Sequence, residues 1–151
     1  MSDLGSARTR DEVILIARIL LAVLFLVFGW SKLIDYSGTA ASMAQAGLPL
    51  PSVAALVAIV VEFFGAIALI LGVWTRPVAL IVAIYTLAAA LIAHHYWTMT
   101  GGARMANMIN FYKNLSIMGG FLLLYVTGAG KYSIDARLGR TGAAPLRTQV
   151  P

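Results

Sequence analysis

The chain alternates between long apolar runs and short polar connections. Crossing about 30 Å of hydrocarbon as an α-helix takes about 20 mainly apolar residues. Four runs are long enough, although Lys113 and Asn114 interrupt the last of them; the runs cover residues 13–34, 52–75, 77–97 and 108–127. This pattern predicts an all-α polytopic membrane protein built as a four-transmembrane-helix bundle.

The connections between these runs refine the prediction. Residues 38–46 are rich in small residues and predict a short interfacial helix between the first and second spans. Thr75-Arg76-Pro77 is so short that the second and third spans must be antiparallel neighbours, whereas residues 98–107 predict a flexible loop. We therefore expect three parts: a polar N-terminus, a transmembrane domain, and a basic, largely disordered tail; these cover residues 1–12, 13–130 and 131–151.

Composition supports a membrane protein and removes several kinds of chemistry. Apolar residues make up 60% of the 151 residues and charged residues 11%, too few to cover a soluble core with polar surface. The chain has no cysteine, which excludes disulfides, thiol redox relays and cysteine-ligated iron–sulfur clusters. The net charge is +5, and most of the basic residues lie outside the apolar runs, where a membrane protein needs them. We therefore expect a lipid bilayer and no nucleic acid as partner.

The distribution of basic residues predicts the orientation. With four spans, both termini lie on one side of the membrane, together with the turn at Arg76. That side carries Arg8, Arg10, Arg76, Lys131, Arg137, Arg140 and Arg147. The opposite side carries Lys32, Arg104 and Lys113. Basic residues are enriched in cytoplasmic loops, so both termini are predicted to be cytoplasmic.

The ionisable residues within the spans are the first candidates for a functional site. A charge inside the hydrocarbon is costly, so it normally faces the bundle interior and has a partner. Counted along their spans, Arg18 and Glu62 lie at depths in the membrane that differ by about 9 Å, a distance that a long arginine side chain can bridge. We therefore predict a buried Arg18–Glu62 pair that fixes helix register or lines a ligand site. Lys32 is the alternative partner of Glu62.

A second candidate group lies at the outer ends of the spans. It forms a predicted polar mouth of Lys32, His94, Asn110, Lys113 and Asn114. The lysines could instead extend to the lipid headgroups, and His94 could be an interfacial residue without chemistry. His94 and His95, the two histidines of the chain, point about 100° apart on a helix and cannot both bind one haem. We expect no metal site.

Several motifs in order resemble those of the DoxX family of bacterial membrane proteins. Phe28-Gly-Trp-Ser-Lys-Leu33 resembles the family's FGxxKL, and Gly47-Leu-Pro its loop signature. Val61-Glu-Phe-Phe-Gly65 and Leu71-Gly-Val-Trp-Thr-Arg76 resemble VExxGG…GLxTR, with Ala66 replacing the second glycine. His94 with Trp97 resembles HxxW, and Asn110-Phe-Tyr-Lys-Asn-Leu115 resembles NFxKNL. The resemblance covers residues 13–135.

The resemblance implies a four-helix inner-membrane protein, and some relatives are linked to membrane redox complexes. It marks as family positions Arg18, Lys32, Glu62, His94, Asn110, Lys113 and Asn114. We expect an accessory or partner subunit of a membrane redox process that holds a quinone-like molecule near Lys32, His94, Lys113 and Asn114. The chain carries no electron carrier, so catalysis on its own is not predicted. The alternatives are a non-enzymatic scaffold or assembly factor and a small-molecule transporter, which would need to form a homo-oligomer.

Overall fold

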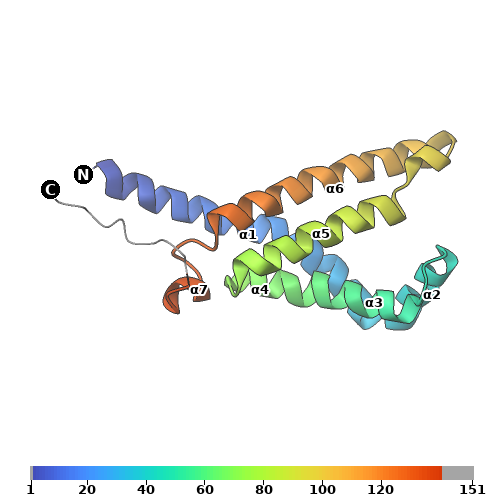
Figure 1. The fold of residues 1–151 in the computed structure, drawn as a ribbon, viewed down its shortest axis with the longest axis horizontal. Helices are drawn as coiled ribbons and strands as arrows, with labels where there is room; N and C mark the ends of the chain where they lie inside the picture. Colours follow the sequence, from blue (N-terminus) through green and yellow to red (C-terminus); the bar gives the residue numbers. More distant parts are fainter. Residues whose placement is uncertain (1, 141–151) are drawn as a thin grey trace.

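The computed structural model describes residues 2–140, with side chains from residue 6 onward, and every regular element in this range is helical. The elements are α1 (Ser2–Ile34), α2 (Tyr36–Gln45), α3 (Pro51–Ile59), the π-helical turn η1 (Val60–Phe64), α4 (Gly65–Leu71), α5 (Thr75–Ala93), the 3₁₀ turn η2 (Tyr96–Thr98), α6 (Gly101–Thr127) and α7 (Ile134–Arg137). The N-terminal end of α1 and α7 lie at one end of the molecule, and α2 and the start of α6 lie at the other (Figure 1). The predicted all-α fold is confirmed.

Four helical rods form the bundle. The first is α1, the second is α3–η1–α4, and the others are α5 and α6. α5 packs along α6, whereas α1 packs against the second rod. The core is made mainly of small and aromatic side chains: Ala22, Ala66, Ala79 and Ala83 let the rods approach closely around Phe25 and Phe121, whose rings meet edge to face at 5.3 Å.

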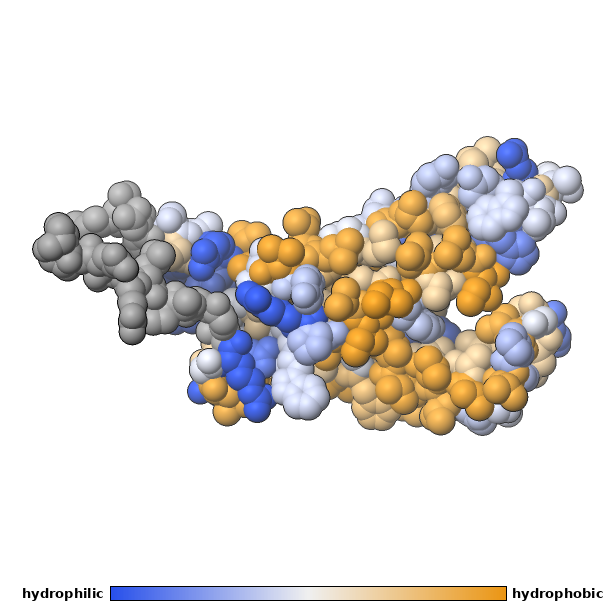
Figure 2. Space-filling view, in the orientation of Figure 1, coloured by the Kyte–Doolittle hydropathy of each residue, from blue (hydrophilic) through white to orange (hydrophobic). Residues whose placement is uncertain are grey.

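The outer surface of the bundle is apolar. Leu20, Leu123 and Val126 are each more than 60% exposed, and Figure 2 shows hydrophobic residues mainly over the middle of the molecule. A surface of this kind would aggregate in water but matches acyl chains. Within the described part of the chain, three helical segments qualify by length and composition as membrane spans: Ser6–Ile34, Pro51–Leu71 and Thr75–Thr98. The chain is therefore a polytopic membrane protein.

The fourth predicted span corresponds to α6, which has 27 residues and is long enough to cross a bilayer. Its first half is polar because it carries Arg104, Asn107, Asn110 and Lys113, so α6 is less apolar than the three other spans. Its packing along α5 keeps it within the bundle (Figure 1). Its crossing of the membrane remains a prediction.

The structure differs from the sequence expectations in several segments. α1 is helical from Ser2, well before residue 13, and most of the expected loop at residues 98–107 is the first part of α6. The expected interfacial helix is present as α2, although nothing in the structure tests its position in a membrane. Of the tail expected to be largely disordered, residues 131–140 lie within the described range, and Ser133 and Asp135 are buried there. The rest of that tail lies outside the described residues.

Candidate functional site

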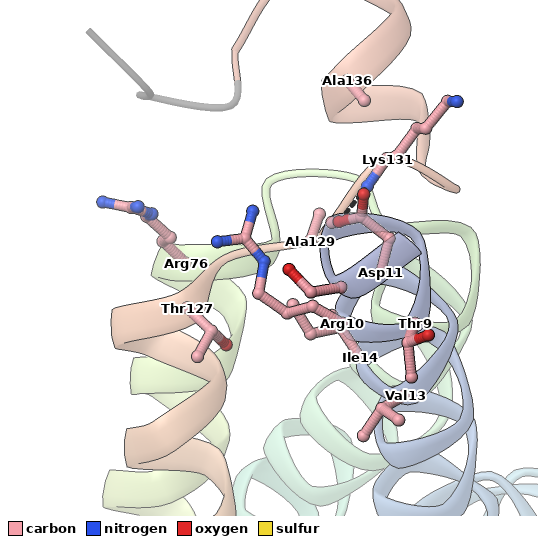
Figure 3. A pocket seen from close by; sticks show the side chains of 12 residues that line it. Thr9, Arg10, Asp11, Val13, Ile14, Arg76, Thr127, Ala129, Lys131 and Ala136 are labelled. Carbon is pink, nitrogen blue, oxygen red and sulfur yellow. Dashed lines mark hydrogen bonds between the residues drawn. The ribbon is translucent and has the colours of Figure 1, made fainter. Parts of the chain in front are cut away.

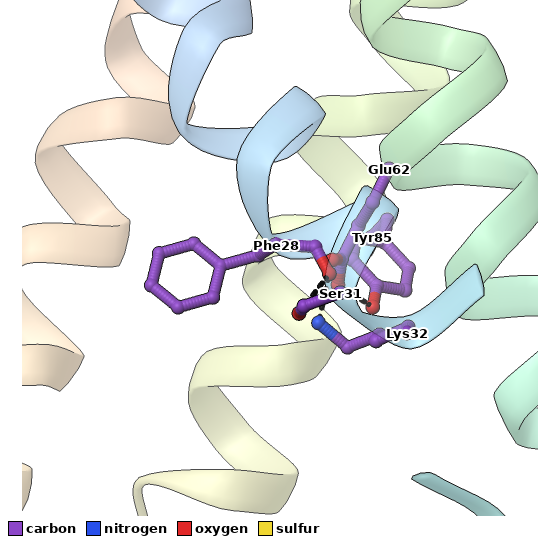
Figure 4. Close-up of polar contacts among 5 residues, drawn as sticks. All are labelled: Phe28, Ser31, Lys32, Glu62 and Tyr85. Atoms are coloured by element: carbon purple, nitrogen blue, oxygen red, sulfur yellow. Dashed lines mark hydrogen bonds and ion pairs between the residues drawn. The ribbon is translucent and has the colours of Figure 1, made fainter. Parts of the chain in front are cut away.

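The central polar group joins three helices and consists of Lys32, Glu62 and Tyr85, here called the polar triad (Figure 4). Lys32 Nζ lies 2.6 Å from one carboxylate oxygen of Glu62, Oε2. The Tyr85 hydroxyl donates a hydrogen bond of 2.5 Å to the other oxygen, Oε1. Glu62 is only 7% exposed, so the ion pair and the phenol together satisfy a carboxylate that is removed from solvent.

The backbone around Glu62 departs from α-helical geometry. Residues Val60–Phe64 form a π-helical turn, and the N–H of Gly65 donates to the carbonyl of Val60, five residues earlier. A π turn adds a residue to one helical turn and therefore rotates the side chains beyond it relative to those before it. Such turns recur at functional sites in proteins. Here the turn carries the one acidic residue of the second rod.

Gly29 allows α1 to approach this turn closely. A Cβ atom at position 29 would lie 2.5 Å from the Phe63 nitrogen and 2.9 Å from the Glu62 carbonyl carbon. Backbone atoms cannot move aside as a side-chain end can, so only glycine fits. The close approach places Lys32, one turn further along α1, within reach of Glu62. Phe28 also lies near the ammonium group, with its ring centroid 5.7 Å from Nζ.

We predict that Gly29→Ala destabilises the bundle by about 1–3 kcal/mol, because the added methyl group overlaps the backbone of the π turn. The measurement is the free energy of unfolding in mixed micelles titrated with a denaturing detergent. Gly119→Ala is the matched control, since a Cβ at that α6 position meets no atom within 4 Å. The control should be neutral or slightly stabilising. Equal losses in the two variants would contradict the close packing described here.

Arg18 belongs to a different cluster from Glu62, so the predicted Arg18–Glu62 pair is wrong. The Arg18 guanidinium donates to the Ala129 carbonyl, to the Ile70 carbonyl at 3.1 Å and to the Tyr132 carbonyl at 2.7 Å. It is 1% exposed, and Asp135 is the nearby acidic residue. We call Arg18, Asp135 and the carbonyl groups that Arg18 contacts the arginine cluster. Lys32, the alternative partner, is the residue that pairs with Glu62.

Asp135 completes the arginine cluster by holding the start of α5. Its carboxylate accepts hydrogen bonds from the backbone N–H groups of Trp74, at 2.9 Å, and Thr75, at 2.8 Å. These are free N–H groups at a helix N-terminus, where a carboxylate is favourable. Gly72, with φ of +71°, leaves space for the Arg18 guanidinium: a Cβ there would lie 2.7 Å from Nη1.

The remaining predicted site residues do not join the triad. His94 Nδ1 lies 2.9 Å from the side-chain oxygen of Asn107, and Lys113 donates to Asn110 within α6 at 2.8 Å. Asn114 is half-buried on the same helix. Within the described residues, Lys32 makes no hydrogen bond to any of these groups. The predicted polar mouth is thus divided. Lys32 lies in the last turn of α1, whereas the other residues lie on α6 and at the end of α5. Among the described residues, no group of three or more acidic or histidine side chains could hold a metal ion.

Two features of the site escaped the sequence reasoning. Tyr85 is a phenol in the middle of an apolar span, and that isolated polar group was the available signal. Asp135 lies beyond the last apolar run, and no periodicity links it to Arg18.

Next to His94, η2 and α6 also form an aromatic cluster: Tyr96 and Trp97 pack on Phe111 with ring centroids 5.6 and 5.7 Å away.

Lys32 also lines a cavity of about 550 Å³ at the end of α1. The other lining residues come from α1, its end and α2: Ser31, Ile34, Asp35, Gly38, Thr39, Ser42 and Met43. The Lys32 side chain is 23% exposed, and an ammonium group has three donors, of which Glu62 takes one. A ligand in this cavity could therefore accept a charged hydrogen bond from Lys32.

Comparison with known proteins gives consistent matches. The family model described as DoxX matches residues 13–95. The inner membrane protein YphA of Escherichia coli (strain K12) is 49% identical over 135 residues, which cover 89% of this chain and 95% of that protein. The inner membrane protein YqjF of the same strain is 41% identical over 136 residues, covering 88% and 97% of the two chains. No solved structure matches significantly.

Proposed function

Because the chain belongs to the DoxX family, we propose that it is a multi-pass protein of the bacterial inner membrane that serves a membrane redox process as an accessory or partner subunit. Its relatives are named as inner membrane proteins, and its own exterior is apolar. The excess of basic residues at the end that carries both termini supports a cytoplasmic position for that end.

The proposed ligand is a quinone or a similar amphipathic carbonyl compound, bound in the cavity beside Lys32. The observation that carries this proposal is the partly exposed ammonium group of Lys32, which lines the cavity and keeps donors beyond its bond to Glu62. A quinone needs a donor for its carbonyl oxygen and apolar surface for its ring and tail. Glu62 pairs with the Lys32 ammonium group and accepts a hydrogen bond from Tyr85, so the two residues hold Lys32 in position. The electrons would come from a partner protein.

The test is the quinone content of the protein extracted in native-lipid nanodiscs, measured by mass spectrometry per folded protein. A hydrogen bond to a charged group contributes about 1.5–3 kcal/mol, so we expect Lys32→Met to weaken quinone binding at least about tenfold. Thr39→Leu fills the cavity from α2 without touching the triad, and it should also remove the quinone. Lys113→Met is the matched control and should retain it. Wild-type protein without quinone would overturn the proposal.

A scaffold or assembly factor is the second candidate, because both carboxylate oxygens of Glu62 already have partners within the chain. A network satisfied in this way needs no ligand, and holding the helices in register is a sufficient role for it. This function predicts that Glu62→Gln lowers thermal stability in detergent but leaves a partner's turnover per folded complex unchanged. A loss of turnover per folded complex in this variant would favour the redox function instead.

A further inference from the structure

A second cavity, of about 780 Å³, lies at the opposite end of the bundle from α2, where α1, α5, α6 and the segment after α6 meet (Figure 3). Three basic residues from separate parts of the chain line it: Arg10 from α1, Arg76 from α5 and Lys131 from the segment after α6. The rest of the lining is Ser6, Thr9, Asp11, Val13, Ile14, Thr127, Ala129, Gly130 and Ala136. We call this the basic cavity.

The two arginines have no carboxylate partner in the part of the chain that the structure describes, where the ion pairs are Arg8–Glu12 and Lys32–Glu62. Asp11, the one acidic residue of the lining, uses Oδ1 to accept the backbone N–H of Lys131 at 3.2 Å. In Figure 3 the Lys131 amine points away from the centre of the view, whereas the Arg10 guanidinium points towards the side that carries Arg76. The Arg76 guanidinium extends away from Arg10, so Arg10 supplies the cation nearest the centre of the cavity and Arg76 supplies a second one at its edge.

The backbone of the segment after α6 shapes the basic cavity. Gly128, at the end of α6, has φ of +76°, and a Cβ there would lie 3.2 Å from Arg76 Nε. Gly130 has φ of +69° and approaches α1 so closely that a Cβ would lie 3.2 Å from Ile14 Cγ2. These positions favour glycine because of their positive φ and their tight contacts. The absence of a side chain at Gly128 leaves room for the Arg76 guanidinium at the end of α6.

The cavity lies where the first apolar run begins, at residue 13, and near the level where one span ends at Leu71 and the next begins at Thr75. This is the level at which lipid phosphates meet a membrane protein. The lining combines cations with apolar groups such as Val13 and Ile14, whereas a free inorganic anion would need no apolar wall. Basic pockets between transmembrane helices bind anionic lipid headgroups in this way. We propose that the basic cavity binds the phosphate headgroup of an anionic phospholipid.

The experiment compares purified, delipidated protein in detergent with and without phosphatidylglycerol, phosphatidylcholine or inorganic phosphate. Lipid binding is measured by native mass spectrometry and by the shift of the thermal unfolding midpoint. Each cation near an anionic lipid surface is worth about 1 kcal/mol, so Arg10→Gln/Arg76→Gln should weaken phosphatidylglycerol binding about 30-fold. The matched control is Arg137→Gln/Arg140→Gln, which removes the same charge at the same end of the molecule, outside the cavity. It should bind as the wild type does.

The outcomes separate the proposal from its rivals. Preference for phosphatidylglycerol over phosphatidylcholine, lost in the cavity variant and kept in the control, supports a lipid site. Equal weakening in both double variants would mean that only net charge matters, and it would overturn the proposal. Protection by inorganic phosphate equal to that by phosphatidylglycerol would also overturn it, because the apolar wall would then have no role.

Discussion

Replacing Arg18 with glutamine is expected to destabilise the bundle by about 3–5 kcal/mol, the usual cost of removing one member of a buried charged network. The variant leaves carbonyl groups of Ala129, Ile70 and Tyr132 without the donor that they share. It also removes a positive charge that interacts with Asp135. The segment after α6 should then detach from the bundle. The free energy of unfolding in mixed micelles measures the first effect, and the rate of tryptic cleavage after Lys131 measures the second.

Arg8→Gln is the matched control for this experiment. Arg8 lies on the same helix and pairs with Glu12 at 2.9 Å, but the Arg8 side chain is 77% exposed and the Glu12 side chain 46%. Exposed ion pairs of this kind contribute little to stability, so the control should unfold and resist trypsin as the wild type does. If Arg18→Gln behaved as the control does, the arginine cluster could not be what holds the C-terminal segment.

The second large effect is expected for the Lys32–Glu62 ion pair. Lys32→Met and Glu62→Gln should each cost about 2–3 kcal/mol, less than a wholly buried pair because the lysine is partly exposed. The double variant leaves no unpaired charge, so it should lose less than the sum of the single variants by about 1–2 kcal/mol. The same detergent titration measures all three variants.

A second cycle tests whether this coupling is specific. Lys113→Met combined with Glu62→Gln should be additive to within about 0.5 kcal/mol, because Lys113 bonds to Asn110 on its own helix. Additivity in the Lys32–Glu62 cycle as well would mean that the 2.6 Å contact between Lys32 Nζ and Glu62 Oε2 contributes nothing to folding.

Periodicity and residue type were sufficient to predict the helical bundle and the set of intramembrane charges. They also identified Arg18, Lys32 and Glu62 as residues to explain, because charges within apolar runs are costly. The predicted Arg18–Glu62 pair is wrong because the two side chains lie at different depths along the bundle. Arg18 bonds to the carbonyl of Ile70, eight residues beyond Glu62 on the second rod, or about 12 Å along a helix. An arginine side chain cannot span that distance.

Two further features of the structure could not be predicted from the sequence pattern. The π turn at Val60–Phe64 changes the helical phase around Glu62, and no residue type in that stretch demands such a turn. Asp135 reaches the start of α5 from 60 residues away in the sequence. A pattern that repeats along one helix carries no information about a loop that folds back over its end.

The position of Arg18 in the sequence also has a consequence for biosynthesis. The arginine leaves the ribosome 111 residues before the Ala129 carbonyl that it binds. Until Ala129 has been synthesised, the guanidinium of the nascent first helix must therefore find water, headgroups or the insertion machinery in place of its final partners. Closure of the bundle around this cation is thus tied to a segment that is made 111 residues later.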